Sequence, residues 1–246
     1  MHILEGEGVT RYFGGLTAVA GVDFHVDAGE IVGLIGPNGA GKTTLFNLIS
    51  AAIAPKCGVI RFKGRDLCGC KPHQVCKAGV ARTFQAVSVF AGLPALTNVF
   101  LAGLFGTAGS VPRAQAAKEA EQWLEFVGLS AAAATPAGEL PLYLQKRLEV
   151  ARALATRPEL LLLDELIAGL NPTEAVGAVE LVRKIRDRGI SILMIEHVMK
   201  AIMSVCDRIM VLHHGEKIAE GTPQRITASK AVIEVYLGEQ GDAGSP

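Results

Sequence analysis

The stretch Gly36-Pro37-Asn38-Gly39-Ala40-Gly41-Lys42-Thr43 decides the fold, because its spacing is that of the phosphate loop G-x-x-x-x-G-K-[ST]. The apolar run 31–35 before it reads as a short strand, and residues 42–50 after it read as a helix. A glycine-rich loop in this position turns backbone N–H groups toward phosphate oxygens, and the N-terminus of the helix favours negative charge. The stretch therefore predicts an α/β protein that binds a nucleotide.

The side chains of the loop have separate expected roles. Lys42 reaches the β- and γ-phosphates as a point charge, Thr43 offers its hydroxyl to Mg²⁺, and Thr44 reaches the α-phosphate. The backbone donors that we expect to face the phosphates belong to Asn38, Gly39, Ala40 and Gly41. The alternative is a chance glycine turn, which the strand before the loop and the helix after it disfavour.

A second chemical element is Leu160-Leu161-Leu162-Leu163-Asp164-Glu165. Four leucines predict a buried parallel strand, and the two acids then emerge at its carboxyl end, where open α/β sheets bind ligands. One carboxylate, Asp164, is a candidate Mg²⁺ ligand, and the next, Glu165, is a candidate base for the attacking water. The alternative, a strand that ends in two solvated acids, loses weight because a phosphate loop lies upstream.

Outward from these motifs, the chain divides by its hydrophobic pattern. Apolar residues alternate with polar ones over 22–27, which predicts a half-buried antiparallel strand. Residues 90–140 are rich in alanine with helical spacing, so we expect an inserted helical subdomain at about 90–157. The predicted fold is a phosphate-loop α/β core with an antiparallel β subdomain and this insertion. We expect one domain over 1–238 and a flexible tail over 239–246.

Composition limits the classes of function. The chain has 246 residues, with 24 Lys and Arg against 24 Asp and Glu, and this zero net charge disfavours a nucleic-acid-binding surface. No stretch approaches the roughly 20 apolar residues that cross a bilayer, and the amino-terminal residues lack a secretory signal pattern. We therefore expect a cytoplasmic location. The five cysteines form no metal-binding pattern, so we expect thiols rather than disulfides.

The order of the motifs along the chain is more informative about function than any single motif. The phosphate loop is followed by Gln85 after a short strand, by the helical insert, by Asp164-Glu165, by a loop at Asn171, and by His197 after a further apolar strand. This order resembles the ATP-binding cassette of ABC transporters over nearly the whole chain. Local strings at 13–19, 81–85, 168–172, 220–223 and 235–238 are similar to those of branched-chain amino-acid importer ATPases.

The resemblance implies a Mg-ATP hydrolase with assigned residues. Phe13 is expected to stack on adenine, and His197 to touch the γ-phosphate. Gln85 is expected to contact Mg²⁺ and the attacking water. Asn171 is expected in the loop between two cassettes.

The same resemblance implies partners. They are a second cassette, identical or paralogous, transmembrane permease subunits at the cytoplasmic face of the membrane and, indirectly, a substrate-binding protein. Phe84, Val89 and Phe90 are candidates for the surface that meets a permease subunit.

One motif departs from the family. The signature loop, usually LSGGQ, aligns here with residues 140–144, so Pro141 replaces the usual serine and Tyr143 replaces a glycine. Leu142 and Leu144 complete the altered loop. In the family this loop serves the ATP of the partner cassette, so we hypothesise an asymmetric heterodimer with one impaired site. The alternative is that this subfamily tolerates the change. At Leu166, where many cassettes have proline, we expect little effect.

Other classes stay open at this stage. Related cassettes serve urea or amide import or lipid export, and cassette residues do not touch the cargo. A soluble ABC ATPase acting on DNA or ribosomes is disfavoured, because the chain has neither a coiled-coil insertion nor a second cassette. A non-hydrolytic nucleotide-binding regulator fits the altered signature but not Glu165 and His197.

Overall fold

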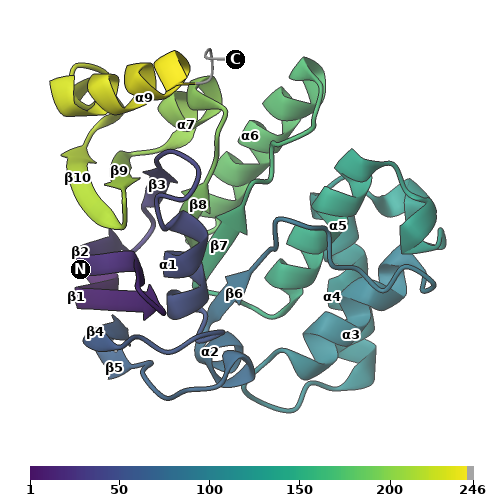
Figure 1. Ribbon diagram of the computed structural model, residues 1–246. Coiled ribbons are helices and arrows are strands. Elements are labelled where there is room, and N and C mark those ends of the chain that lie inside the picture. The colour runs from purple at the N-terminus through teal and green to yellow at the C-terminus, as the bar shows by residue number, and fades with distance from the viewer. Residues whose placement is uncertain (243–246) are drawn as a thin grey trace. The chain divides into compact units, whose positions relative to one another are not determined.

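A computed structural model describes residues 1–242 and divides the chain into two compact units (Figure 1). The first unit combines Met1–Gly69 with Ser191–Pro246, and the second is Cys70–Ile190. The second unit is wider than the helical insert expected at 90–157, because it also contains two strands and two further helices.

An antiparallel sheet lies in the first unit, with the strand order β2-β1-β4-β5. Its strands are β1 (His2–Phe13), β2 (Leu16–Asp27), β4 (Cys57–Phe62) and β5 (Arg65–Asp66). Val22, Phe24 and Val26 of β2 are buried, whereas the residues between them are not. The predicted alternation is confirmed, and its cause is the period of two along a strand with one buried face.

Four further strands of this unit belong to a second sheet, and two of them are buried along their whole length. β3 (Ile31–Ile35) pairs in parallel with both β8 (Ser191–Ile195) and β9 (Arg208–His213), and β10 (Glu216–Gly221) pairs antiparallel with β9. Every residue of β3 and β8 is buried, as expected for parallel strands. Strands β9 and β10 form a hairpin in which His213 stands opposite Glu216.

Four helices of the described chain belong to the first unit. They are α1 (Lys42–Ile49), α7 (Met199–Val205), α8 (Pro223–Thr227) and α9 (Lys230–Asp242). A Cβ on Gly33 of β3 would lie 3.0 Å from Cys206 Sγ and 3.3 Å from Ile202 Cδ1, so α7 packs closely on that strand. Helix α9 continues to Asp242, and residues 243–246 lie outside the described chain, so the flexible tail expected over 239–246 stays a prediction.

The second unit contains two short parallel strands, β6 (Val80–Arg82) and β7 (Leu160–Asp164). Helices α2 (Pro72–Ala78) and α6 (Pro172–Arg186) accompany them. At the start of α6 the Asn171 side chain accepts a bond from the Glu174 N–H, and the Glu174 carboxylate accepts one from the Asn171 N–H, each 3.0 Å long. This capping box fixes where the helix begins.

Helices α3 (Ala95–Phe105), α4 (Arg113–Phe126) and α5 (Leu142–Ala155) pack together in the second unit (Figure 1). The short 3₁₀ turns are Ser130–Ala132 and Ala137–Glu139. The stretch expected to be helical is therefore confirmed. Helix α5 begins at Leu142, because Pro141 can occupy an N-cap position without an N–H to donate. Within residues 1–242, we find no helix long and apolar enough to span a bilayer.

Candidate nucleotide-binding site

The phosphate loop joins β3 to α1 in the first unit and depends on two glycines. Gly36 has φ 149° and Gly41 has φ 102°, both in the region that favours glycine. A Cβ at Gly36 would lie 2.1 Å from the Leu212 carbonyl oxygen, and one at Gly41 would lie 2.2 Å from that of Ala18. The neighbouring backbone therefore leaves no space for a larger residue at either position.

Lys42 lies at the first turn of α1 and is only 6% exposed. Its Nζ donates to the Gly36 carbonyl at 2.6 Å and to the Pro37 carbonyl at 2.8 Å, so the ammonium group lies against the loop. Thr43 is exposed and Thr44 is half-buried. The loop thus carries one positive charge, two hydroxyl groups and a helix N-terminus, which is the chemistry of a phosphate site.

His197 leaves the same edge of the first unit as the phosphate loop. β3 and β8 run in parallel with Leu34 opposite Ile195, and His197 follows two residues later, exposed to solvent. Phe13 ends β1 with 46% of its surface exposed. The Arg11 guanidinium lies 4.8 Å from the centre of the Phe13 ring. The Phe13 ring is therefore an aromatic group at the surface with a cation beside it.

In the second unit, Gln85 and Glu165 meet directly. β6 and β7 are parallel, with Arg82 opposite Leu162, so both residues leave the carboxyl edge of these strands. The Gln85 Nε2 donates to the Glu165 Oε2 at 3.1 Å. Glu165 has φ 53°, a left-handed conformation that is rare outside glycine and typical of strained functional positions.

Asp164 forms a buried ion pair that the sequence did not predict. The Arg82 Nη2 lies 2.9 Å from the Asp164 Oδ2, with the side chains 8% and 1% exposed. The Asp164 N–H donates to the Thr83 Oγ1 at 3.1 Å. Arg82, at the end of β6, therefore holds the Asp164 carboxylate, and the next residue, Thr83, holds the Asp164 backbone.

Two charged residues of α5 hold the loops beside these acids. The Lys146 Nζ donates to the carbonyls of Glu165 at 2.7 Å and Ala168 at 2.6 Å. Glu149 accepts a bond from the Phe84 N–H at 3.0 Å. Burial raises the pKa of Glu149, although hydrogen bonds from Phe84 and Ser88 and the nearby positive side chains oppose the change.

The spacing of residues along α5 could have indicated that Lys146 and Glu149 are buried. Lys146, Glu149, Val150 and Ala153 follow the i, i+3, i+4, i+7 pattern of one helix face, and all four are buried. A charged residue on an otherwise apolar face needs a polar partner, so the pattern indicates that Lys146 and Glu149 have structural contacts.

The altered signature loop forms the start of α5. Pro141 is the N-cap, and the Leu144 and Gln145 N–H groups both bond to its carbonyl, at 2.9 and 3.0 Å. Leu142 is 48% exposed, so the helix presents a leucine side chain at its N-terminus. The first turn of α5 thus presents an apolar side chain at the position of the signature loop.

The predicted site residues thus fall into two sets. The phosphate loop, Phe13 and His197 belong to the first unit, and the acids, Gln85, Asn171 and residues 140–144 belong to the second. A glycine-bounded loop between a parallel strand and a helix, with a buried lysine, defines the class: a phosphate-loop nucleotide-binding protein.

Comparison with known proteins identifies the family. The model of the ABC transporter family matches residues 19–168, and that of the branched-chain amino acid ATP-binding cassette transporter matches residues 216–242. The chain is 43% identical to the high-affinity branched-chain amino acid transport ATP-binding protein BraF of Pseudomonas aeruginosa, covering 96% of this chain and 98% of BraF.

Two solved structures are similar. The ADP conformation of MJ1267, an ATP-binding cassette of an ABC transporter, has a TM-score of 0.87 at 31% identity and covers 97% of this chain and 99% of its own. The dimeric cassette MJ0796 has a TM-score of 0.81 at 25% identity and covers 89% and 98%. The chain belongs to the ABC transporter family, as an ATP-hydrolysing cassette.

Proposed function

We propose that this cassette powers the import of branched-chain or similar amino acids. The observation that carries the proposal is the match of residues 216–242 to the branched-chain cassette model, because this C-terminal segment lies outside the general ABC match at 19–168. The similarity to BraF over 96% of the chain supports the same substrate class. Import of urea or amides and export of lipids are the alternatives.

The catalytic proposal gives each residue the role that the resemblance to ABC cassettes implies, and the family match over 19–168 includes the phosphate loop and both acids. Lys42 binds the β- and γ-phosphates. Glu165 accepts a hydrogen bond from the attacking water and withdraws its proton as the water oxygen bonds to the γ-phosphorus. The bond from that phosphorus to the oxygen bridging the β- and γ-phosphates breaks, and this oxygen leaves with ADP. The products are ADP and phosphate, and His197 donates to the γ-phosphate.

Mg²⁺ fits the donors that the chain offers. Oxygen ligands suit this ion, and Thr43, Gln85 and Asp164 provide a hydroxyl, an amide oxygen and a carboxylate. The bond from Gln85 to Glu165 uses the amide nitrogen, so the amide oxygen is the atom assigned to the metal. When bound, the ion neutralises phosphate charge.

Cassettes of this family dimerise and act with membrane-spanning permease subunits, and the dimeric MJ0796 cassette is one example. We propose that this chain acts at the cytoplasmic face of the membrane with such subunits. Phe84 and Phe90 are 51% and 50% exposed, beside the loop that Glu149 holds, and are our candidates for the surface that meets a permease.

Uptake of radiolabelled leucine tests the proposed substrate class. We expect cells that carry the intact transport operon to accumulate leucine, and cells in which the only copy of this cassette is Lys42→Ala to lose uptake, because phosphate binding fails. Arg157→Met is the control for expression, since its ion pair with Glu119 is solvent-accessible. If leucine uptake is unchanged but urea uptake is lost, the amino-acid proposal is wrong.

The altered signature loop gives a second prediction, on asymmetry. If residues 140–144 serve the ATP of a paralogous partner, restoring Pro141→Ser and Tyr143→Gly will raise ATP turnover per complex. Each hydrogen-bond donor aimed at developing charge contributes on the order of 3 kcal/mol, so an increase of tenfold or more at that site is expected. Phosphate release measured on the assembled complex checks it; unchanged turnover would show that the subfamily tolerates the altered loop.

A further inference from the structure

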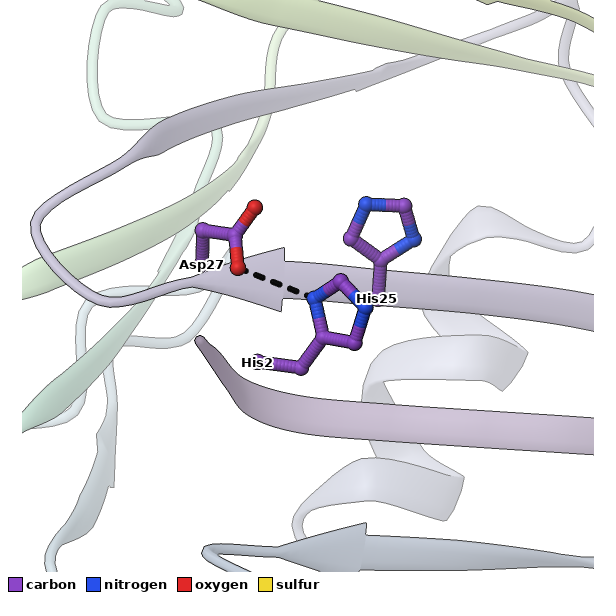
Figure 2. Close-up of side chains that lie close together, drawn as sticks. All are labelled: His2, His25 and Asp27. Carbon is purple, nitrogen blue, oxygen red and sulfur yellow. Dashed lines mark hydrogen bonds and ion pairs between the residues drawn. The ribbon is translucent and has the colours of Figure 1, made fainter.

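Three ligand-type side chains gather at one end of the antiparallel sheet in the first unit (Figure 2). The His2 Nδ1 lies 2.9 Å from the Asp27 Oδ1, and the His2 and His25 ring centres are 4.3 Å apart. One ligand atom from each of the three side chains lies within 4.8 Å of the others. The nucleotide chemistry uses none of them.

The pairing of β1 with β2 explains why they meet. His25 and Asp27 are two residues apart on β2 and therefore share a face. His2 stands opposite Asp27, but Leu4 stands opposite Val26, so Ile3 is an extra residue in a bulge. Ile3 and Leu4 are both buried, and the bulge turns His2 to the face of His25 and Asp27.

These side chains form a known kind of ligand set. Two imidazoles and one carboxylate suit Zn²⁺, which commonly takes three protein ligands and one water. Tetrahedral bonds of about 2.0–2.1 Å place ligand atoms about 3.3 Å apart, so the widest pair must close by at most about 1.5 Å. His2 and Asp27 are 47% and 40% exposed at their side chains, so rotation about their side-chain bonds can provide this movement.

The charged groups around these three side chains affect how well they can bind a cation. The Met1 amino group lies 3.2 Å from the Asp27 Oδ1, and Arg208 donates to the His25 carbonyl. Arg208 is itself paired with Glu30 and Glu220, so its charge is largely balanced. Burial, followed by the charge of Arg208, lowers the pKa of His25, which keeps its imidazole neutral near pH 7.

The cluster is distant from the phosphate loop. Ala18 of β2 lies against Gly41, whereas His25 is seven residues further along the same strand, about 23 Å at the rise of a β-strand. We propose that His2, His25 and Asp27 bind a divalent transition-metal ion of the zinc class. The ion links the first residues of β1 to the end of β2 and takes no part in ATP hydrolysis.

Titration of the full chain with Co²⁺, a spectroscopic substitute for Zn²⁺, tests the proposal. The protein is purified without a histidine tag and kept free of nucleotide, because ATP chelates metals. We expect one equivalent to bind with visible absorption of tetrahedral type, and Zn²⁺ to displace it. Loss of one ligand in His25→Gln should weaken binding by at least about tenfold.

Matched variants separate this site from other histidines. His213 and His214 also have ring centres 4.0 Å apart, so His214→Gln is the control and should leave the titration unchanged. ATP binding by the His25→Gln chain reports that it is folded. Equal Co²⁺ affinity in wild type and in the combined His2→Gln, His25→Gln and Asp27→Asn variant, or loss of binding in His214→Gln, would overturn the proposal.

Discussion

Replacing Glu165 with glutamine will reduce ATP hydrolysis by a factor of about 10²–10⁴ and leave ATP binding intact, because only the proton acceptor is removed. The amide has the size of the carboxylate, and its oxygen can still accept the bond from the Gln85 Nε2, which is 3.1 Å from the Glu165 Oε2. The left-handed backbone at Glu165 is also unchanged by this substitution.

Steady-state phosphate release and equilibrium binding of a fluorescent ATP analogue measure the two effects separately. Glu174→Gln is the matched control, since it makes the same chemical change in the same unit, where the carboxylate serves as a helix cap. We expect the control to hydrolyse ATP at nearly the wild-type rate. Turnover by Glu165→Gln within a fewfold of wild type would exclude Glu165 as the base.

Most of the fold could be predicted from local patterns. The alternation in β2, the continuous apolar runs of β3 and β7, and the Asn171 capping box all depend on residues close together in sequence. The start of α5 at Leu142 is harder to predict, because Pro141 also fits a loop. Its fixed φ, −55° here, equally suits the residue before a helix.

The candidate site was predictable where one residue type performs one task. A lysine after a glycine loop and an acid after an apolar strand have few alternative roles. The structure places Lys42 at the start of α1 and Asp164 at the end of β7, as expected. Residues that act through other residues were missed. Lys146 contacts carbonyls 19 and 22 positions away, and no local pattern names a partner at that distance.

Arg82 is the clearest example of a residue that acts through another residue. It lies 82 positions before Asp164 and yet is paired with it. Taking two charges out of water is costly, and their mutual attraction offsets the cost only while both are present. Removing the guanidinium therefore leaves a carboxylate that is 1% exposed with a large electrostatic penalty. The pair is thus a larger determinant of stability than any exposed ion pair of the described chain.

Arg82→Met will consequently lower the free energy of unfolding by about 3–5 kcal/mol, measured by urea denaturation. Arg157→Met, which breaks the more exposed pair with Glu119, should cost no more than about 1 kcal/mol. Because the penalty comes from the charge left behind, adding Asp164→Asn to Arg82→Met should restore part of the lost stability. The single variant Asp164→Asn is measured as well. If the stability losses of Arg82→Met and Asp164→Asn add up to that of the double variant within about 0.5 kcal/mol, the two residues are not coupled, and Arg82 stabilises the protein by packing alone.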